Sequence, residues 1–292
     1  MREKGIVLTS ISAIAYGLVP LFTVYLMDAS FDAISIGFFR FFFMGLYTFV
    51  VALLTRSSFK MDKSMWPSLL LAAIGQCATI LLLNVSYEMI PVGNATSLHF
   101  MYPIFVSLIL YYYYRNQFSK RQVIALCLSV VGIVCFMDIS NMGNLLGMLL
   151  ALCSGFTYAM YMVLLEKHHL TQLSSSVLTT YLCLIESVVL FVLGLTQNSF
   201  SISFDANIVF YLIILVGFTL IGQLFLQKGT HYIGAAMASL FCLFEPLTSL
   251  ISGWIFLGDP VRIMSIIGCG FICVGIMQIM TRRNKNGNHS LP

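Results

Sequence analysis

Residues 87–137 decide the fold, and they read YEMIPVGNATSLHFMYPIFVSLILYYYYRNQFSKRQVIALCLSVVGIVCFM. The stretch opens on a turn, Pro91-Val92-Gly93, and then holds two apolar runs that are joined by a short basic segment. A helix needs roughly 20 apolar residues to cross the hydrocarbon core of a bilayer. Pro103 stands in the middle of the first run, and Val131-Gly132-Ile133 stands late in the second. The stretch predicts two membrane-spanning helices, and the same pattern continues over the rest of the chain.

Composition excludes a soluble globular domain. Of the 292 residues, 59% are hydrophobic and only 9% are charged. A soluble protein carries about 25% charged residues, and this chain lacks the polar side chains to cover a water-exposed surface. The formal net charge is +4, and the basic residues stand between apolar runs rather than in one patch. We therefore expect a lipid bilayer as the surroundings and no nucleic acid as a partner.

Ten apolar runs follow one another with short, turn-rich connections. No connection is long enough to fold as a separate soluble domain. The sequence predicts an all-α integral membrane protein of about ten transmembrane helices. The spans are expected near residues 5–27, 33–54, 67–88, 94–114, 122–138, 145–165, 175–196, 207–227, 234–257 and 261–281.

Basic residues predict the orientation of these spans. With the N-terminus inside, every Lys and Arg except Arg40 and Arg262 falls in a cytoplasmic segment. Cytoplasmic loops of membrane proteins carry an excess of Lys and Arg, and an odd number of spans would put half of these loops on the wrong side. We expect a multi-pass protein of the cell membrane with both termini in the cytoplasm.

The two halves of the chain resemble each other. A single offset without a gap aligns Pro103 with Pro246, and Val131-Gly132-Ile133 with Val274-Gly275-Ile276. Each half holds five spans, an odd number, so the second half enters the membrane from the opposite side, as in many secondary transporters. The alternative is chance similarity between apolar helices. The expected units are a first repeat, a second repeat and a disordered cytoplasmic tail, at residues 1–138, 145–281 and 282–292.

Several motifs go beyond this periodicity. They are Tyr16-Gly17, Arg40, Tyr102-Pro103, Val131-Gly132-Ile133, Gly234-Ala235-Ala236, Glu245-Pro246, Leu257-Gly258-Asp259-Pro260 and Val274-Gly275-Ile276. In these motifs the chain resembles the drug/metabolite transporter superfamily, specifically its ten-helix EamA-like branch. The resemblance implies two inverted five-helix repeats, a central substrate cavity and alternating access. It also implies a small-molecule substrate, which in this superfamily is an amino acid, a nucleobase-like compound, a sugar or a drug.

The sequence departs from that family at one junction in each half. The family often has Gly-Glu between the last two helices of a half, whereas this chain has Arg115-Asn116 and Gly258-Asp259. The departure leaves the expected fold intact. It weakens any role for an acidic side chain at the first junction.

Four titratable side chains stand inside expected spans, namely Arg40, His99, Glu186 and Glu245. A charge at the bilayer centre costs roughly 2.5–3.5 kcal/mol on insertion scales, so each needs a reason. Arg40 stands among phenylalanines, and we expect it to anchor a substrate carboxylate or to join a gating ion pair. The alternative is a structural pair with a buried acid or with helix-end carbonyls. Glu186 is a candidate proton carrier, and the alternative is a neutral side chain bonded to a neighbouring helix.

His99 and Tyr102 are three positions apart and so share a helix face. The repeat offset aligns them with Cys242 and Glu245, so a polar residue precedes the proline in both halves. We expect Glu245, His99 and Tyr102 to line the cavity, and the alternative is an internal hydrogen-bond network. Tyr158 is a further candidate, as part of an aromatic wall, with core packing as the alternative.

Enzymatic signatures are missing from the sequence, among them H-E-x-x-H, G-x-S-x-G and the Walker A motif. The cysteines form no C-x-x-C pair and stand near no histidine at zinc spacing, so we expect no metal site and no cofactor. The sequence predicts a secondary active transporter, specifically an exporter, of a small polar or amphipathic metabolite, with a proton or another ion as the coupling partner. The alternative is an intramembrane enzyme or a lipid-processing membrane protein.

Overall fold

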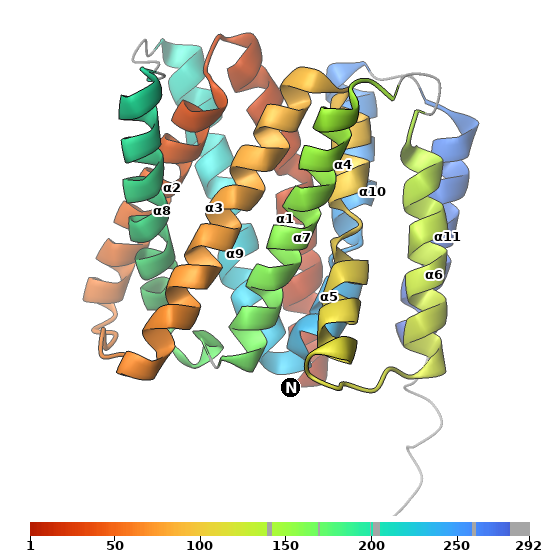
Figure 1. Ribbon diagram of the computed structural model, residues 1–292, viewed down its shortest axis with the longest axis horizontal. Helices are drawn as coiled ribbons and strands as arrows, with labels where there is room; N and C mark the ends of the chain where they lie inside the picture. Colours follow the sequence, from red (N-terminus) through yellow and green to blue (C-terminus); the bar gives the residue numbers. More distant parts are fainter. Residues whose placement is uncertain (139–141, 169, 199, 201–204, 259–260, 281–292) are drawn as a thin grey trace, which may run out of the picture.

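The computed structural model is an upright bundle of helices (Figure 1). It describes residues 1–138, 142–168, 170–198, 200, 205–258 and 261–280, and no strand occurs among them. The α-helices are α1 (Arg2–Asp28), α2 (Ala33–Leu54), α3 (Trp66–Met89), α4 (Val92–His99), α5 (Tyr102–Tyr112), α6 (Lys120–Phe136), α7 (Leu145–Lys167), α8 (Ser175–Gln197), α9 (Ala206–Phe241), α10 (Phe244–Ser252) and α11 (Ile263–Met280). Short elements are the 3₁₀ turns η1 (Lys63–Met65) and η3 (Leu170–Gln172) and the π-turn η4 (Gly253–Leu257).

The all-α membrane fold predicted from the sequence is confirmed. Within the described residues, 7 stretches are helical, long and apolar enough to cross a membrane, and two shorter apolar helices accompany them. Large apolar side chains such as Phe42, Leu46, Leu184 and Ile213 point away from the bundle. In water such a surface would be an aggregation hazard, whereas in a bilayer it faces lipid.

Two of the expected spans, 94–114 and 234–257, are not continuous α-helices. The first is divided into α4 and α5 at Phe100–Met101, and the second is divided between α9 and α10 at Cys242–Leu243. Each break falls shortly before a proline, which lacks the backbone N–H that would bond four residues back. Non-helical backbone at membrane depth survives where it is buried in protein or lines a cavity.

A third change of direction lies inside α9. Gly234 has φ 74° and ψ 162°, so α9 consists of two helical segments, before and after this residue. Glycine adopts a positive φ without the cost that a side chain would bring. The second segment begins with Ala235, whose N–H donates to a carboxylate oxygen of Glu166 on α7. That bond satisfies one of the free N–H groups at the start of a helix.

Helix pairing fits two inverted repeats. α1 packs along α9 as α3 packs along α7, while α2 pairs with α8 and α6 with α11. If each of the first five spans is exchanged with its counterpart in the last five, the α1–α9 pair becomes the α3–α7 pair. The α2–α8 and α6–α11 pairs become themselves. In Figure 1, α1 starts at the lower face and α7 starts at the upper face, so the halves enter from opposite sides. α11 ends at the lower face, where α1 begins; that this face is cytoplasmic stays a prediction.

The α6–α11 contact repeats at residues that the sequence offset relates. A Cβ on Gly132 would lie 2.7 Å from the carbonyl oxygen of Gly268, and one on Gly275 would lie 3.1 Å from that of Ala125. Gly132 corresponds to Gly275, and Ala125 to Gly268, so the two contacts are equivalent by repeat. Small residues of this kind let helix backbones approach closely in a membrane.

Gly268→Ala is therefore expected to destabilise the protein, whereas Gly270→Ala on the same helix is not. A Cβ on Gly268 would lie 2.5 Å from the Gly132 oxygen, while nothing lies within 4 Å of one on Gly270. Overpacking of this kind costs roughly 1–3 kcal/mol. Thermal unfolding of both variants in one detergent measures the effect. Equal melting temperatures would show that α6 and α11 do not meet at these glycines.

Candidate functional site

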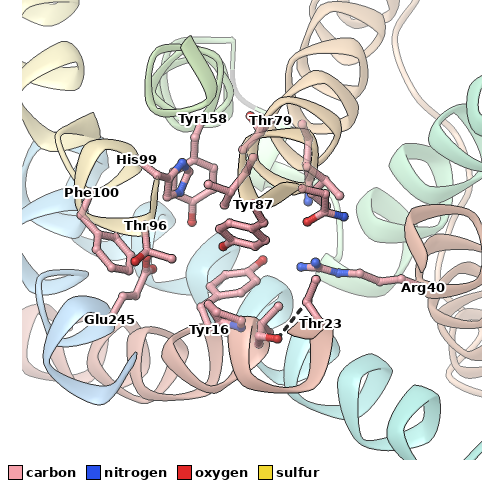
Figure 2. A pocket seen from close by; sticks show the side chains of 16 residues that line it. Tyr16, Thr23, Arg40, Thr79, Tyr87, Thr96, His99, Phe100, Tyr158 and Glu245 are labelled. Carbon is pink, nitrogen blue, oxygen red and sulfur yellow. Dashed lines mark hydrogen bonds between the residues drawn. The ribbon is translucent and has the colours of Figure 1, made fainter. Parts of the chain in front are cut away.

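A central cavity of about 80 Å³ lies between the two halves of the bundle (Figure 2). Side chains from α1, α2, α3, α4, α7 and α10 surround it, together with Phe100 at the break between α4 and α5. The lining residues are Tyr16, Val19, Pro20, Thr23, Arg40, Gln76, Thr79, Ile80, Leu83, Asn84, Tyr87, Thr96, His99, Phe100, Tyr158 and Glu245. Four of the six predicted site residues are among them, namely Arg40, His99, Tyr158 and Glu245.

Arg40 reaches into this cavity from α2 (Figure 2). It lies on the buried face of the helix with Gly37 and Met44, while Phe42 and Phe43 face outward. The side chain is 7% exposed, and its Nε has no hydrogen-bond partner. Among the described residues no carboxylate oxygen lies within 4.0 Å of the guanidinium. A buried charge without a partner is costly, so the guanidinium is available to an anionic group that enters the cavity.

Glu245 stands at the other end of the cavity (Figure 2). It belongs to the first turn of α10, directly after the helix break, and is 3% exposed. Its Oε1 has no hydrogen-bond partner. The carboxyl group interacts electrostatically with Tyr158 and Tyr102, although the Tyr102 hydroxyl makes no hydrogen bond of good geometry. The cavity thus has a basic group at one end and an acidic group at the other.

Aromatic rings form the wall on the α4 and α7 side. The Tyr158 ring lies 5.5 Å from that of His99 and 4.8 Å from that of Tyr102, in an edge-to-face arrangement with the latter. His99 Nδ1 is 2.9 Å from the Ser154 hydroxyl, which fixes the imidazole. Tyr102 is 1% exposed and lies behind this wall rather than in it. The expectation that Tyr102 lines the cavity is not met in this conformation.

Glu186 also lies outside the cavity lining. It is on α8, fully buried, and neither of its carboxylate oxygens has a hydrogen-bond partner. The side chain interacts electrostatically with Arg40, but the two form no ion pair within 4.0 Å. Glu186 is therefore placed to influence the charge at Arg40 without touching a molecule in the cavity.

Two further lining residues, Tyr16 and Tyr87, are absent from the predicted site. Their rings face each other between the basic and acidic ends of the cavity (Figure 2). The sequence does carry a signal for Tyr87, because Gln76, Asn84 and Tyr87 recur at helical spacing along α3. A stripe of this kind marks one helix face, although it does not reveal what that face meets.

A hydrogen-bond network closes the cavity toward the face where α1 begins. The Gln223 side chain on α9 exchanges hydrogen bonds with Gln76 on α3, at 2.9 and 3.1 Å. It also accepts from the Tyr16 hydroxyl and donates to the Tyr161 oxygen. Four helices are joined in this way below the cavity. Buried polar networks of this kind are rigid when every member is satisfied.

Toward the opposite face the cavity adjoins a larger hollow of about 500 Å³, called the vestibule here. The two share Pro20, Thr96 and Phe100, and the vestibule extends to the exposed residues Asp28 and Pro91. A solute therefore meets the vestibule before the cavity when it arrives from the face opposite the N-terminus.

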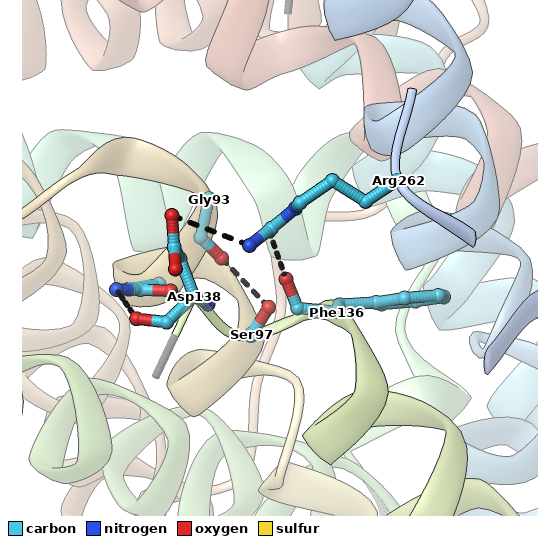
Figure 3. A network of polar contacts seen from close by, with 6 residues as sticks. Gly93, Ser97, Phe136, Asp138 and Arg262 are labelled. Carbon is cyan, nitrogen blue, oxygen red and sulfur yellow. Dashed lines mark hydrogen bonds and ion pairs between the residues drawn. The ribbon is translucent and has the colours of Figure 1, made fainter. Parts of the chain in front are cut away.

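Polar contacts tie the rim of the vestibule together (Figure 3). Arg262 lies 3.3 Å from an Asp138 carboxylate oxygen and donates to the Phe136 carbonyl at 2.8 Å. The Asn94 side chain bonds the backbone N–H and carbonyl of Asp138. These contacts connect α4, the end of α6 and the start of α11 on one face of the bundle.

Comparison with known proteins agrees with this architecture. The sequence model of the EamA-like transporter family matches residues 3–137 and 145–281, one match in each half. An "Uncharacterized transporter" of Archaeoglobus fulgidus is 27% identical over 206 residues, which cover 69% of this chain and 72% of the relative. The "Uncharacterized transporter YdfC" of Bacillus subtilis is 23% identical over 245 residues, which cover 82% and 79%.

A solved crystal structure has the same fold. It superposes with a TM-score of 0.77, covering 98% of this chain and 100% of that chain, at 14% sequence identity. At that identity the likeness concerns the fold alone.

Proposed function

We propose that this chain, which belongs to the EamA-like transporter family, binds a small zwitterionic metabolite in its central cavity. The metabolite then crosses the membrane by alternating access. The observation that carries the proposal is the placement of a basic side chain, Arg40, and an acidic side chain, Glu245, at the two ends of one aromatic-lined cavity. The chain is a membrane transporter of the EamA type, and the identity of its substrate is what we infer from this pair.

Each part of the cavity suits one part of such a substrate. The Arg40 guanidinium offers a planar fork of donors, which matches a carboxylate in two parallel hydrogen bonds. Glu245 at the other end offers an acceptor for a protonated amine. Tyr16, Tyr87 and Tyr158 supply aromatic faces between the ends, and such faces favour apolar groups and cations. The cavity selects a small amphipathic molecule with a carboxylate and an amine.

The broken helices are where the conformational change would occur. α4 and α10 flank the cavity, and both spans lose regular helical bonds at mid-depth. Substrate sites of inverted-repeat transporters lie at such discontinuous helices near the repeat interface. At about 80 Å³ the cavity is narrow, so loading requires that α4 or α10 swing outward on one side while the Gln223 network stays closed on the other.

Coupling to protons follows from the chemistry of Glu245. A carboxyl group binds either a proton or the amine of the substrate, not both at once. If Glu245 takes up a proton when the cavity opens to one face and substrate when it opens to the other, the protein exchanges protons for substrate across the membrane. Because the proton gradient of most cells is directed inward, this exchange drives the substrate out, and we propose export with both termini in the cytoplasm.

Counterflow in liposomes tests this function. Purified protein is reconstituted with an unlabelled amphipathic amino acid inside, and the uptake of labelled metabolites from a panel is measured. Analogues blocked at one charge, an amide of the carboxylate and an N-acetyl form of the amine, serve as matched controls. The zwitterions should exchange and both blocked forms should compete poorly. Equal competition by the blocked forms would reject the two-charge site.

A further inference from the structure

A second hollow, separate from the transport path, lies on the outer surface between α2 and α8. Its volume is about 380 Å³, and it shares no lining residue with the cavity or the vestibule. We call it the α2–α8 groove, and it is lined by Phe42, Gly45, Leu46, Phe49, Phe59, Thr180, Tyr181, Cys183, Leu184 and Ser187. A Cβ on Gly45 would lie 2.9 Å from Cys183 Cβ, so the two helices nearly touch at the bottom of the groove.

The walls of this groove present hydrocarbon. Leu46 is 52% exposed and Leu184 is 60% exposed, one on each side. Two of the three hydroxyl groups in the lining have hydrogen-bond partners: Thr180 bonds the Thr48 hydroxyl and a backbone carbonyl, and Tyr181 donates to the Phe59 carbonyl at 2.7 Å. A dry, elongated hollow on a membrane-facing surface fits an alkyl chain.

One end of the groove reaches the membrane surface. Tyr181 is in edge contact with Phe59 and with Trp66, at ring distances of 6.0 and 5.7 Å. Trp and Tyr side chains favour the level of the lipid headgroups. The groove therefore runs from the hydrocarbon region to the headgroup region at the face where the N-terminus lies.

Three cations stand beyond that end of the groove. Arg56 lies in the turn directly after α2, which ends at Leu54, and it has φ 51°. Lys60 and Lys63 follow in the connection to α3, and all three cations are exposed. None of the three forms an ion pair in the described part of the chain. Asp62 is the one acid between Thr55 and Met65, so this segment is basic overall.

We propose that the α2–α8 groove binds one acyl chain of an anionic phospholipid, whose phosphate is held by Arg56, Lys60 and Lys63. This inference rests on the cytoplasmic position proposed above for the face with the N-terminus, because the cytoplasmic leaflet carries the anionic lipids that juxtamembrane Lys and Arg attract. A second copy of the chain fits less well, because a two-fold pairing through this face would bring the same cations together. Charge complementarity therefore selects an anionic lipid as the occupant.

The chain carries its own probe for this lipid. It has 2 tryptophans: Trp66 contacts the groove through Tyr181, whereas Trp254 lines the vestibule near the other face. With Trp254→Phe, fluorescence reports Trp66 alone. Vesicles of phosphatidylcholine would contain a minor fraction of either brominated phosphatidylglycerol or brominated phosphatidylcholine. We expect brominated phosphatidylglycerol to quench Trp66 at least about threefold more effectively than brominated phosphatidylcholine, because three cations at the surface attract the anionic lipid.

Matched charge removals decide where that preference comes from. Arg56→Gln, Lys60→Gln and Lys63→Gln together should make the two brominated lipids equal. Arg115→Gln, Lys120→Gln and Arg121→Gln remove the same charge from another loop and should leave the preference intact. Equal quenching in the starting protein, loss of preference in both triple variants, or no quenching by either lipid would each overturn the proposal. The last result would mean that a second copy of the chain covers the groove.

Discussion

Arg40→Gln is expected to abolish high-affinity binding of the transported zwitterion. The guanidinium is buried at the cavity and has no acidic partner within 4.0 Å among the described residues. A substrate carboxylate would supply that partner, and a hydrogen bond to a charged group is worth about 1.5–3 kcal/mol. Each 1.4 kcal/mol is a factor of ten, so affinity in counterflow should fall roughly 10- to 100-fold.

The carboxamide analogue separates this role from a structural one. Wild type should prefer the carboxylate, and Arg40→Gln should bind the carboxylate and the carboxamide about equally. The preference of Arg40→Lys for the carboxylate should lie between that of wild type and that of Arg40→Gln, since lysine keeps the charge but loses the planar fork. If the variant weakened both compounds by the same factor, Arg40 would be a structural residue. Monodisperse elution in detergent controls for folding.

Glu245→Gln is expected to eliminate transport driven by a pH gradient, while substrate exchange continues at lower affinity, because the glutamine oxygen still accepts a hydrogen bond from the substrate amine but carries no charge. The change keeps the size of the side chain and removes the group that binds the proton. Glu245 lines the cavity, and its Oε1 has no protein partner, so the carboxyl group is free to exchange ligands. Proton-driven flux and counterflow, measured on the same liposomes, give the two readouts.

Glu186→Gln is the matched control for this prediction. Glu186 is buried like Glu245 but does not line the cavity, and its neutral variant should retain pH-driven flux. Unchanged pH-driven flux in Glu245→Gln, with loss in Glu186→Gln, would move the proton site to α8. In that case Glu186 would act on the substrate through its electrostatic interaction with Arg40.

Sequence predicts the membrane fold well because lipid constrains each span separately. Apolar length and the Pro103 and Pro246 positions follow from local chemistry, and the structure places a helix break within three residues before each proline. The register after a break is a different matter. His99 and Tyr102 would share a face on a continuous helix, but the chain leaves the α-helical path at Phe100–Met101, so the spacing no longer fixes where Tyr102 points.

Contacts between spans could not be predicted in this way. The cost of burying Arg40, Glu186 and Glu245 applies equally to all three, so it marks them without showing which of them meet in space. The structure brings Arg40 and Glu245 to one cavity and leaves Glu186 behind the lining. A tyrosine such as Tyr16 costs little free energy to bury, so its presence in an apolar span does not mark it as a site residue in the sequence.

Accessibility of a thiol at position 96 tests most directly that the substrate occupies the central cavity. Thr96 lines both the cavity and the vestibule, so an impermeant thiol reagent added at the face opposite the N-terminus should label Thr96→Cys above the level of the parent protein. Saturating zwitterion should slow this labelling, and Arg40→Gln should remove the protection. Labelling that is unaffected by substrate in the Thr96→Cys protein would contradict a substrate site between Arg40 and Glu245.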